Sequence, residues 1–130
     1  MILLDTQAAI YMTLDKEKLS PDAASEIRSR SRIPEGLALA SSSLWEVAMI
    51  SAKGRLRHQR PLADYLRYLE TILIVLPITG AIAERAVQFS DGYPRDPADR
   101  LIGATALVHG MDLITSDERI RSSGEVRCIW

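Results

Sequence analysis

The sequence predicts an α/β fold, a three-layer sandwich in which helices flank a mostly parallel central sheet of four to five strands. Short apolar runs typical of buried strands alternate with longer amphipathic segments typical of helices. Helix caps and turn residues separate these segments along the chain. No linker, repeat or low-complexity tract interrupts the alternation, so we expect residues 1–130 to form a single domain.

The N-terminal part predicts one strand and two helices. Residues 1–4 are a continuous apolar run, as expected of a strand that is buried on both faces. A short helix around Tyr11 follows. Ser20 and Pro21 then start a second helix as its N-cap and first residue. The Pro-Glu-Gly sequence at residues 34–36 ends that helix.

The middle of the chain predicts a strand, two helices and a further strand. Residues 37–40 form the second strand, and the helix after it begins near Ser43 and ends at Gly54. Pro61 starts another helix, whose apolar residues recur at the i, i+3, i+4, i+7 spacing of a buried stripe. Residues 72–76 are apolar and mostly β-branched, which indicates the third strand.

Two helices follow the third strand. Thr79 caps the first, which is expected to carry Phe89 near its end. Asp96 opens the second, the most apolar helix of the chain, over residues 98–109. It has little polar face, so we expect a central position, and Gly110 stops it.

The C-terminal part completes the sheet. Residues 113–115 form a fourth strand, Asp117 begins a short helical turn, and residues 126–129 form a fifth strand. The full predicted order is therefore β-α-α-β-α-α-β-α-α-β-α-β. Alternation of this kind implies a mostly parallel sheet with helices on both faces.

Composition limits the classes of function. The net charge is −1, so the molecule as a whole has no strong attraction for nucleic acid. The single cysteine, Cys128, cannot form an internal disulfide, which fits a reducing compartment. We find no membrane segment or signal peptide and therefore expect a cytoplasmic protein.

Four acidic residues stand where strands end or helices begin: Asp5, Glu46, Asp99 and Asp117. A parallel sheet can gather such positions at one edge, because ligands in open α/β sheets bind outside the carboxyl ends of the strands. Gathered carboxylates would repel one another and their pKa values would rise. A hard cation such as Mg²⁺ or Mn²⁺ removes that repulsion, which predicts a metal site.

Most of these acids also have a structural interpretation. Ser43 and Glu46 fit a capping box, Asp99 would favour the dipole of its helix, and Asp117 could cap a turn. Asp5 is the exception, because an acid that ends an N-terminal strand has no routine structural role. Asp96 is most simply an N-cap, and whether it also takes part in the site is left open.

Four hydroxyl residues lie near the same predicted edge: Thr6, Ser43, Thr115 and Ser116. They could orient the carboxylates or a metal-bound water, although caps and turns explain them equally well. The chain shows no Gly-rich phosphate loop, no nucleophile elbow and no matched His or Cys ligands. The aromatic residues of the middle helices are expected in the core rather than stacked on bases: Trp45, Tyr65 and Tyr68.

The chain resembles the PIN-domain ribonucleases, in particular the VapC-type toxins of toxin–antitoxin pairs. The matching segments are LLDT, SSSLWEVAMISAKGRL and RDPADRLIGATALVHGMDLITSD. The resemblance implies that Asp5 and Asp99, rather than Asp96, are the principal Mg²⁺ ligands. Glu46 and Asp117 would bind a second ion or hold water. It also implies RNA as substrate, a homodimer and a cognate antitoxin.

The resulting hypothesis is a small metal-dependent endoribonuclease. Basic residues outside the pocket would offset the repulsion between its acidic rim and RNA, and Arg55 and Arg57 are the candidates. Two other functions fit the same residues. One is a non-catalytic module that docks a basic partner in the acidic pocket. The other is a related metal-dependent DNA nuclease or phosphatase.

Overall fold

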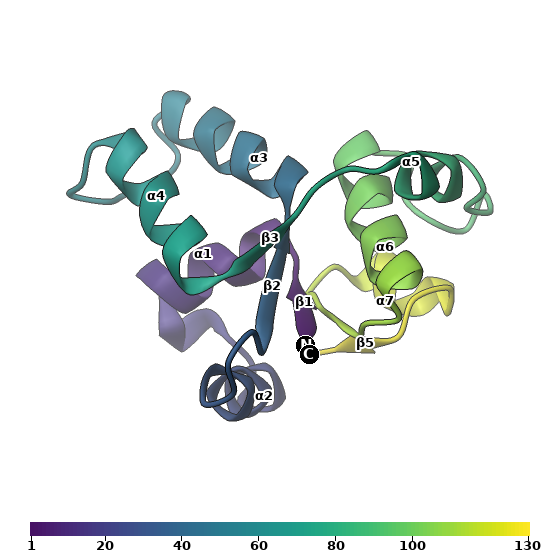
Figure 1. The fold of residues 1–130 in the computed structure, drawn as a ribbon, viewed down its shortest axis with the longest axis horizontal. Coiled ribbons are helices and arrows are strands. Elements are labelled where there is room, and N and C mark those ends of the chain that lie inside the picture. Colours follow the sequence, from purple (N-terminus) through teal and green to yellow (C-terminus); the bar gives the residue numbers. More distant parts are fainter.

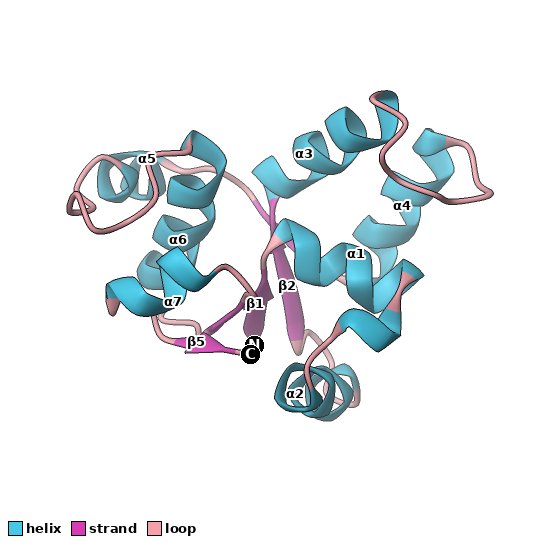
Figure 2. Ribbon diagram, turned by 180° about the vertical axis from the view of Figure 1, so that it is seen from behind, coloured by secondary structure: helices cyan, strands magenta, loops and turns pink.

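A computed structural model describes all 130 residues and shows a five-stranded parallel sheet between two layers of helices (Figures 1 and 2). The strands lie in the order β3-β2-β1-β4-β5, and every neighbouring pair is parallel. The predicted three-layer α/β fold and order of elements are confirmed. The elements are β1 (Ile2–Leu4), α1 (Thr6–Leu14), the 3₁₀ turn η1 (Lys16–Lys18), α2 (Pro21–Ser31), β2 (Leu37–Ala40), α3 (Ser41–Ala52), α4 (Leu62–Ile72), β3 (Ile74–Leu76), α5 (Gly80–Ala86), α6 (Pro97–His109), β4 (Leu113–Ile114), α7 (Glu118–Ser123) and β5 (Cys128–Ile129).

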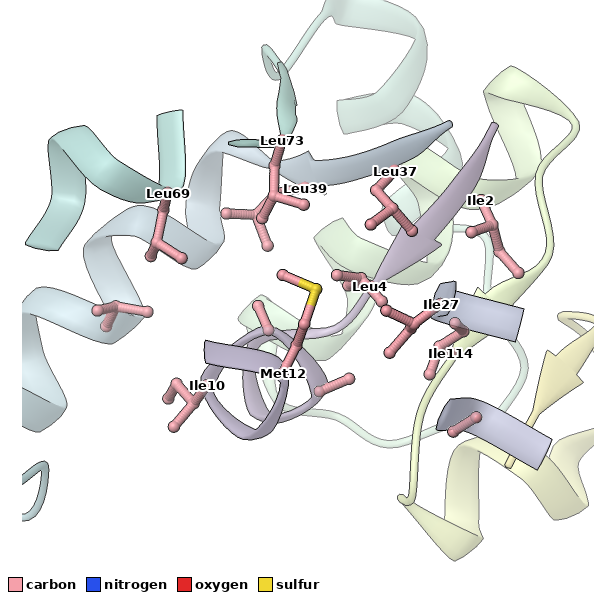
Figure 3. Close-up of a cluster of buried hydrophobic side chains, with 14 of the residues drawn as sticks. Ile2, Leu4, Ile10, Met12, Ile27, Leu37, Leu39, Leu69, Leu73 and Ile114 are labelled. Carbon is pink, nitrogen blue, oxygen red and sulfur yellow. The ribbon is translucent and has the colours of Figure 1, made fainter. Parts of the chain in front are cut away.

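The alternation of side chains along the strands divides the core into two parts. Ile2 and Leu4 pack in one cluster with residues of α1 to α4, whereas Leu3 between them packs in a second cluster with residues of α5 to α7. Figure 3 shows the first cluster, where Leu39 of β2 lies among side chains of the covering helices. Helices cover both faces of the sheet, so side chains on both sides of each strand are shielded from water. This explains why the strand sequences are continuous apolar runs.

Several predicted boundaries differ from the structure. The fourth strand ends at Ile114 rather than at residue 115. The third strand begins at Ile74 rather than residue 72, because α4 continues to Ile72. The fifth strand is also shorter than residues 126–129 and begins at Cys128. Helix α5 ends at Ala86, and Phe89 instead stacks on Tyr93 with ring centroids 3.9 Å apart. Phe89 is thus a core residue supplied by a loop.

Trp45 was expected in the core, and this prediction is wrong, since 64% of the residue is exposed. Helix geometry gives the reason. Ser43 and Val47, four residues apart, are both fully buried, so that face of α3 points inward and Trp45 between them points outward. Tyr65 is buried as predicted, and Tyr68 is partly buried against the first cluster. No helix of the structure has both the length and the apolar character needed to cross a bilayer.

Candidate active site

The strand order creates a crevice at the carboxyl ends of the central strands. The chain runs outward from β1 to β2 and β3, and then places β4 and β5 on the other side of β1. The carboxyl ends of β1 and β4 therefore form the topological switch point, the usual ligand site of open α/β sheets. A pocket of about 280 Å³ opens there, lined by Asp5, Thr6, Gln7, Glu46, Ile50, Asp99, Ile102, Ser116 and Asp117. We call it the acidic pocket.

Asp5 joins β1 to α1 and is 9% exposed. One carboxylate oxygen, Oδ1, accepts a hydrogen bond of 2.7 Å from the Ala8 N–H, which makes Asp5 the N-cap of α1. The prediction that Asp5 has no routine structural role is therefore wrong. Capping and site formation are compatible, because the cap uses only one oxygen and fixes the direction of the other.

Glu46 enters the acidic pocket from the second turn of α3. The helix begins at Ser41, directly after β2, so Ser43 lies inside it and cannot be its N-cap. The capping-box interpretation is therefore wrong. Glu46 Oε1 instead accepts a hydrogen bond from the Thr6 hydroxyl, which is also 2.9 Å from the buried Ser43 hydroxyl. Two of the predicted hydroxyl residues thus hold this carboxylate in place.

Asp99 lies in the first turn of α6, and its carboxylate accepts no hydrogen bond from the protein. Asp96 caps the helix by accepting bonds from the Ala98 and Asp99 N–H groups, at 2.8 and 3.3 Å. The Tyr93 hydroxyl donates to the Asp99 carbonyl at 2.8 Å. A Cβ at Gly103 would overlap that hydroxyl, so the glycine lets Tyr93 support this turn. Asp96 keeps its predicted capping role and does not line the pocket.

Asp117 both caps a helix and lines the acidic pocket. Its Oδ1 accepts hydrogen bonds from the Arg119 and Ile120 N–H groups at 2.9 and 3.0 Å. The Thr115 hydroxyl accepts from the Asp117 N–H at 3.1 Å and also hydrogen-bonds the Asp5 carboxylate. Thr115 therefore connects the acids that follow β1 and β4, while Ser116 lines the pocket itself.

Burial and mutual repulsion raise the pKa values of three site acids. Burial raises the pKa of Asp5 to about 6, and the nearby Glu46 and Asp117 add to the rise against hydrogen bonds from Thr115 and Ala8. Burial raises the pKa of Asp99 to about 7, with further increases from Asp96, Asp117, Glu46 and Asp5. The pKa of Glu46 is raised by burial and by Asp96, against its bond from Thr6.

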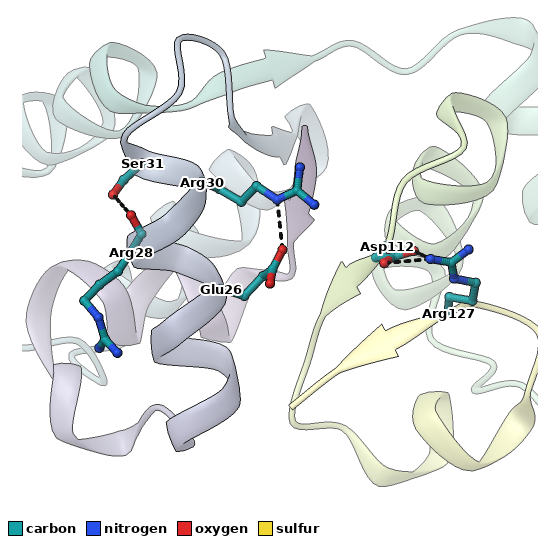
Figure 4. A network of polar contacts seen from close by, with 6 residues as sticks. All are labelled: Glu26, Arg28, Arg30, Ser31, Asp112 and Arg127. Carbon is teal, nitrogen blue, oxygen red and sulfur yellow. Dashed lines mark hydrogen bonds and ion pairs between the residues drawn. The ribbon is translucent and has the colours of Figure 1, made fainter.

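No basic side chain offsets this charge. The four ion pairs of the structure all use other acids: Asp15, Glu26, Asp64 and Asp112. Figure 4 shows two of them, Arg30–Glu26 and Arg127–Asp112. The Nε of Arg100, next to Asp99, donates to the Pro94 carbonyl instead. The acidic pocket therefore holds uncompensated negative charge.

The four carboxylates of the pocket supply the oxygen ligands that a hard cation such as Mg²⁺ takes. In their present rotamers no three acidic side chains converge closely enough to ligate one ion together. Caps and the Thr6 bond hold three of the carboxylates, whereas that of Asp99 is free to reorient. Mg²⁺ keeps several waters and uses one or two carboxylates, so three direct protein ligands are not required.

The sequence did not single out Gln7, Ile50 and Ile102, which also line the acidic pocket. Helical spacing could have identified two of them. Ile50 lies four residues after Glu46 on α3, and Ile102 three residues after Asp99 on α6, so each shares the face of its acid. Arg55 and Arg57 do not line this pocket but line a neighbouring one.

The fold and the site define a PIN-like α/β protein, and comparison with known proteins agrees. The profile of the PIN domain family matches residues 2–125, so the chain belongs to the PIN-domain family. It is 35% identical over 131 residues to Ribonuclease VapC22 from Mycobacterium tuberculosis, covering 99% of this chain and 98% of that protein. The predicted resemblance to VapC-type proteins is confirmed.

Solved structures share the fold. The crystal structure of VapBC2 from Rickettsia felis, bound to a promoter DNA fragment, contains a chain with a TM-score of 0.74 and 14% identity, over 98% of this chain and 97% of that one. FitAcB from Neisseria gonorrhoeae gives a TM-score of 0.66 and 21% identity, over 98% and 96%. At these identities the likeness concerns the fold alone.

Proposed function

We propose that this chain is a metal-dependent endoribonuclease that hydrolyses RNA phosphodiester bonds as the toxin of a type II toxin–antitoxin pair. One observation carries the proposal: in a PIN-domain chain, Asp5, Glu46, Asp99 and Asp117 line one pocket without a basic partner. A full-length relative is named a ribonuclease, which supports RNA as the substrate.

Each acid has a role in this proposal. Asp5 and Asp99 are the principal ligands of Mg²⁺ or Mn²⁺, while Glu46 and Asp117 hold a second ion or the attacking water. A bound ion supplies two things, a lowered pKa for its water and charge that offsets the developing phosphate oxyanion. Thr6 and Ser43 position Glu46, Thr115 supports Asp5 and Asp117, and Ser116 lines the pocket beside them.

RNA cleavage by purified, partner-free chain tests the proposal. Incubation with RNA and Mg²⁺ should give cleavage that Asp5→Asn and Asp99→Asn each reduce at least about 100-fold. Asparagine at residue 5 keeps an oxygen that can cap α1, so folding should persist. Asp64→Asn is the matched control, because this acid is exposed on α4 and pairs only with Arg67.

Three outcomes would contradict the proposal. Equal cleavage by the wild type and the Asn variants would assign the activity to a contaminant. Binding of an Arg-rich peptide without metal binding or turnover would indicate a docking module. Preferred cleavage of DNA or of a phosphomonoester would change the substrate class.

The partners in this proposal are a cognate antitoxin and a second copy of the chain, in the cytoplasm. Two similar solved chains come from complexes described as toxin–antitoxin or VapBC assemblies, which supports the antitoxin. Co-expression with the product of a neighbouring gene should give a co-purifying complex with suppressed RNA cleavage. Light scattering of the free chain should give twice the chain mass, and a monomer would contradict the homodimer.

A further inference from the structure

A second groove joins the acidic pocket. It has a volume of about 740 Å³ and lies between α1, η1 and the loop that follows α3. Gln7 and Ile50 line both cavities, so the two adjoin at these residues. Beyond this junction the charged lining residues are three basic ones, Lys18, Arg55 and Arg57, and one acid, Asp15. We call it the basic groove.

The arginines of the basic groove carry unpaired charge. Lys18 is bound to Asp15 at 2.8 Å, which neutralises that end. Arg55 and Arg57 are exposed, and neither forms any of the four ion pairs of the structure. Arg60 of the same loop lies over the Tyr68 ring instead, 4.6 Å from its centroid. Free positive charge thus gathers beside the acidic pocket.

Apolar side chains complete the groove. Ile50 and Leu56 are partly buried in its lining, and Tyr11 contributes an aromatic ring. Such a lining, with cations at the rim, suits a single strand whose bases are unstacked, because bases can pack on apolar and aromatic groups while phosphates contact arginine. A duplex keeps its bases stacked inside and would not use it.

We propose that the basic groove binds the single-stranded RNA that flanks the scissile phosphate on one side. Arg55 and Arg57 contact backbone phosphates, and Gln7 at the junction contacts the nucleotide next to the cleaved bond. The proposal rests on the ribonuclease function proposed above. Its physical reason is that an acidic pocket repels RNA, so a strand needs cations close by to enter.

RNA binding by a double variant tests the proposal. Cleavage is blocked with Asp99→Asn, and the affinity for a labelled eight-nucleotide single-stranded RNA is measured with Mg²⁺ at several salt concentrations. Adding Arg55→Ala with Arg57→Ala should weaken binding about 10-fold or more and reduce the salt slope by about 1.4, the value for two lost contacts on single strands. Adding Arg28→Ala with Arg32→Ala, the same change of charge on α2 and its C-cap, should change affinity less than twofold.

Several results would overturn the proposal. These are an unchanged affinity and salt slope, an equal loss in the α2 control, or equal competition by duplex RNA. A double variant that keeps its RNA affinity but no longer binds the antitoxin would assign the groove to a protein partner. Failure of the proposed ribonuclease function would give a different result. The wild type would then cleave no RNA, whatever the affinity of the groove for RNA.

Discussion

The two edges of the sheet contain cavities of opposite character. At the carboxyl edge the acidic pocket holds about 280 Å³ and four carboxylates. Near the start of β2, an apolar groove of about 770 Å³ lies among α1, α2, the end of α4 and β3, with Arg28 and Arg30 on its lining. The larger cavity has no cluster of reactive groups. Convergent charge, rather than volume, therefore identifies the candidate active site.

The two regions also contribute differently to the molecule: the residues around the large groove stabilise the fold, whereas those of the acidic pocket serve the proposed function. The helices beside the large groove bury apolar side chains that stabilise the fold, such as Leu69 and Ile27. The acidic pocket brings together like charges whose pKa values rise, so its formation is unfavourable without a cation. Substitutions in the two regions should therefore change different measured quantities.

The largest expected effect on stability comes from the first core cluster, which lies between the sheet and helices α1 to α4. Leu39→Ala removes a fully buried side chain of β2 and should lower the free energy of unfolding by about 2–5 kcal/mol. Urea denaturation measures this loss. Cleavage per folded molecule should stay near the wild-type value, and a loss of activity beyond the unfolded fraction would show that the two regions are coupled.

Mg²⁺ should stabilise the chain through the acidic pocket. At 100 times its dissociation constant, an ion that binds only the folded state adds about 2.7 kcal/mol. Thermal unfolding with and without Mg²⁺ measures the shift, and Asp5→Asn should reduce it. The Asp64→Asn control should keep it, and an equal shift in both variants would place ion binding elsewhere.

The metal-free chain should lose stability as pH rises. The folded-state pKa values of Asp5, about 6, and Asp99, about 7, exceed the ordinary value of 3.8, so the folded state binds more protons between about pH 4 and 7. The free energy of unfolding should therefore fall by about 1–3 kcal/mol from pH 5 to 8. This range already includes a reduction for Asp99, because solvent screens the charge of a partly exposed group. Chemical denaturation at each pH checks this. Asp5→Asn should flatten the profile, and a rise in stability over this window would contradict it.

The smallest effect concerns the positioning of Glu46. Thr6→Val removes the hydroxyl that bonds its carboxylate and should cost about 1 kcal/mol of stability. Cleavage should fall about 10-fold, because Glu46 loses its orientation. Thr6→Ser keeps the hydroxyl and should restore most of the rate. If serine fails to rescue, the threonine acts through packing.

The order of helices and strands could be read from the sequence because its signals are local. Ser20 with Pro21, Thr79, Asp96 and Gly110 cap or end helices as predicted. Two local interpretations failed because they needed the exact start of a helix. Because α1 begins at Thr6, Asp5 is the N-cap of that helix. Because α3 begins at Ser41, Ser43 lies inside α3 and is not its N-cap. The exposure of Trp45 has another cause: Ser43 and Val47 place one face of α3 in the core, and Trp45 lies on the opposite face.

The sequence by itself determined the α/β class, the order of the elements and the four acids that resemble the PIN-domain site. Only the tertiary structure decided the strand order, the shared pocket and the junction at Gln7 and Ile50. The bond between Thr6 and Glu46 spans 40 residues, and the raised pKa of Asp5 comes chiefly from burial. Periodicity and caps act over a few residues, whereas burial and charge repulsion depend on which distant segments meet.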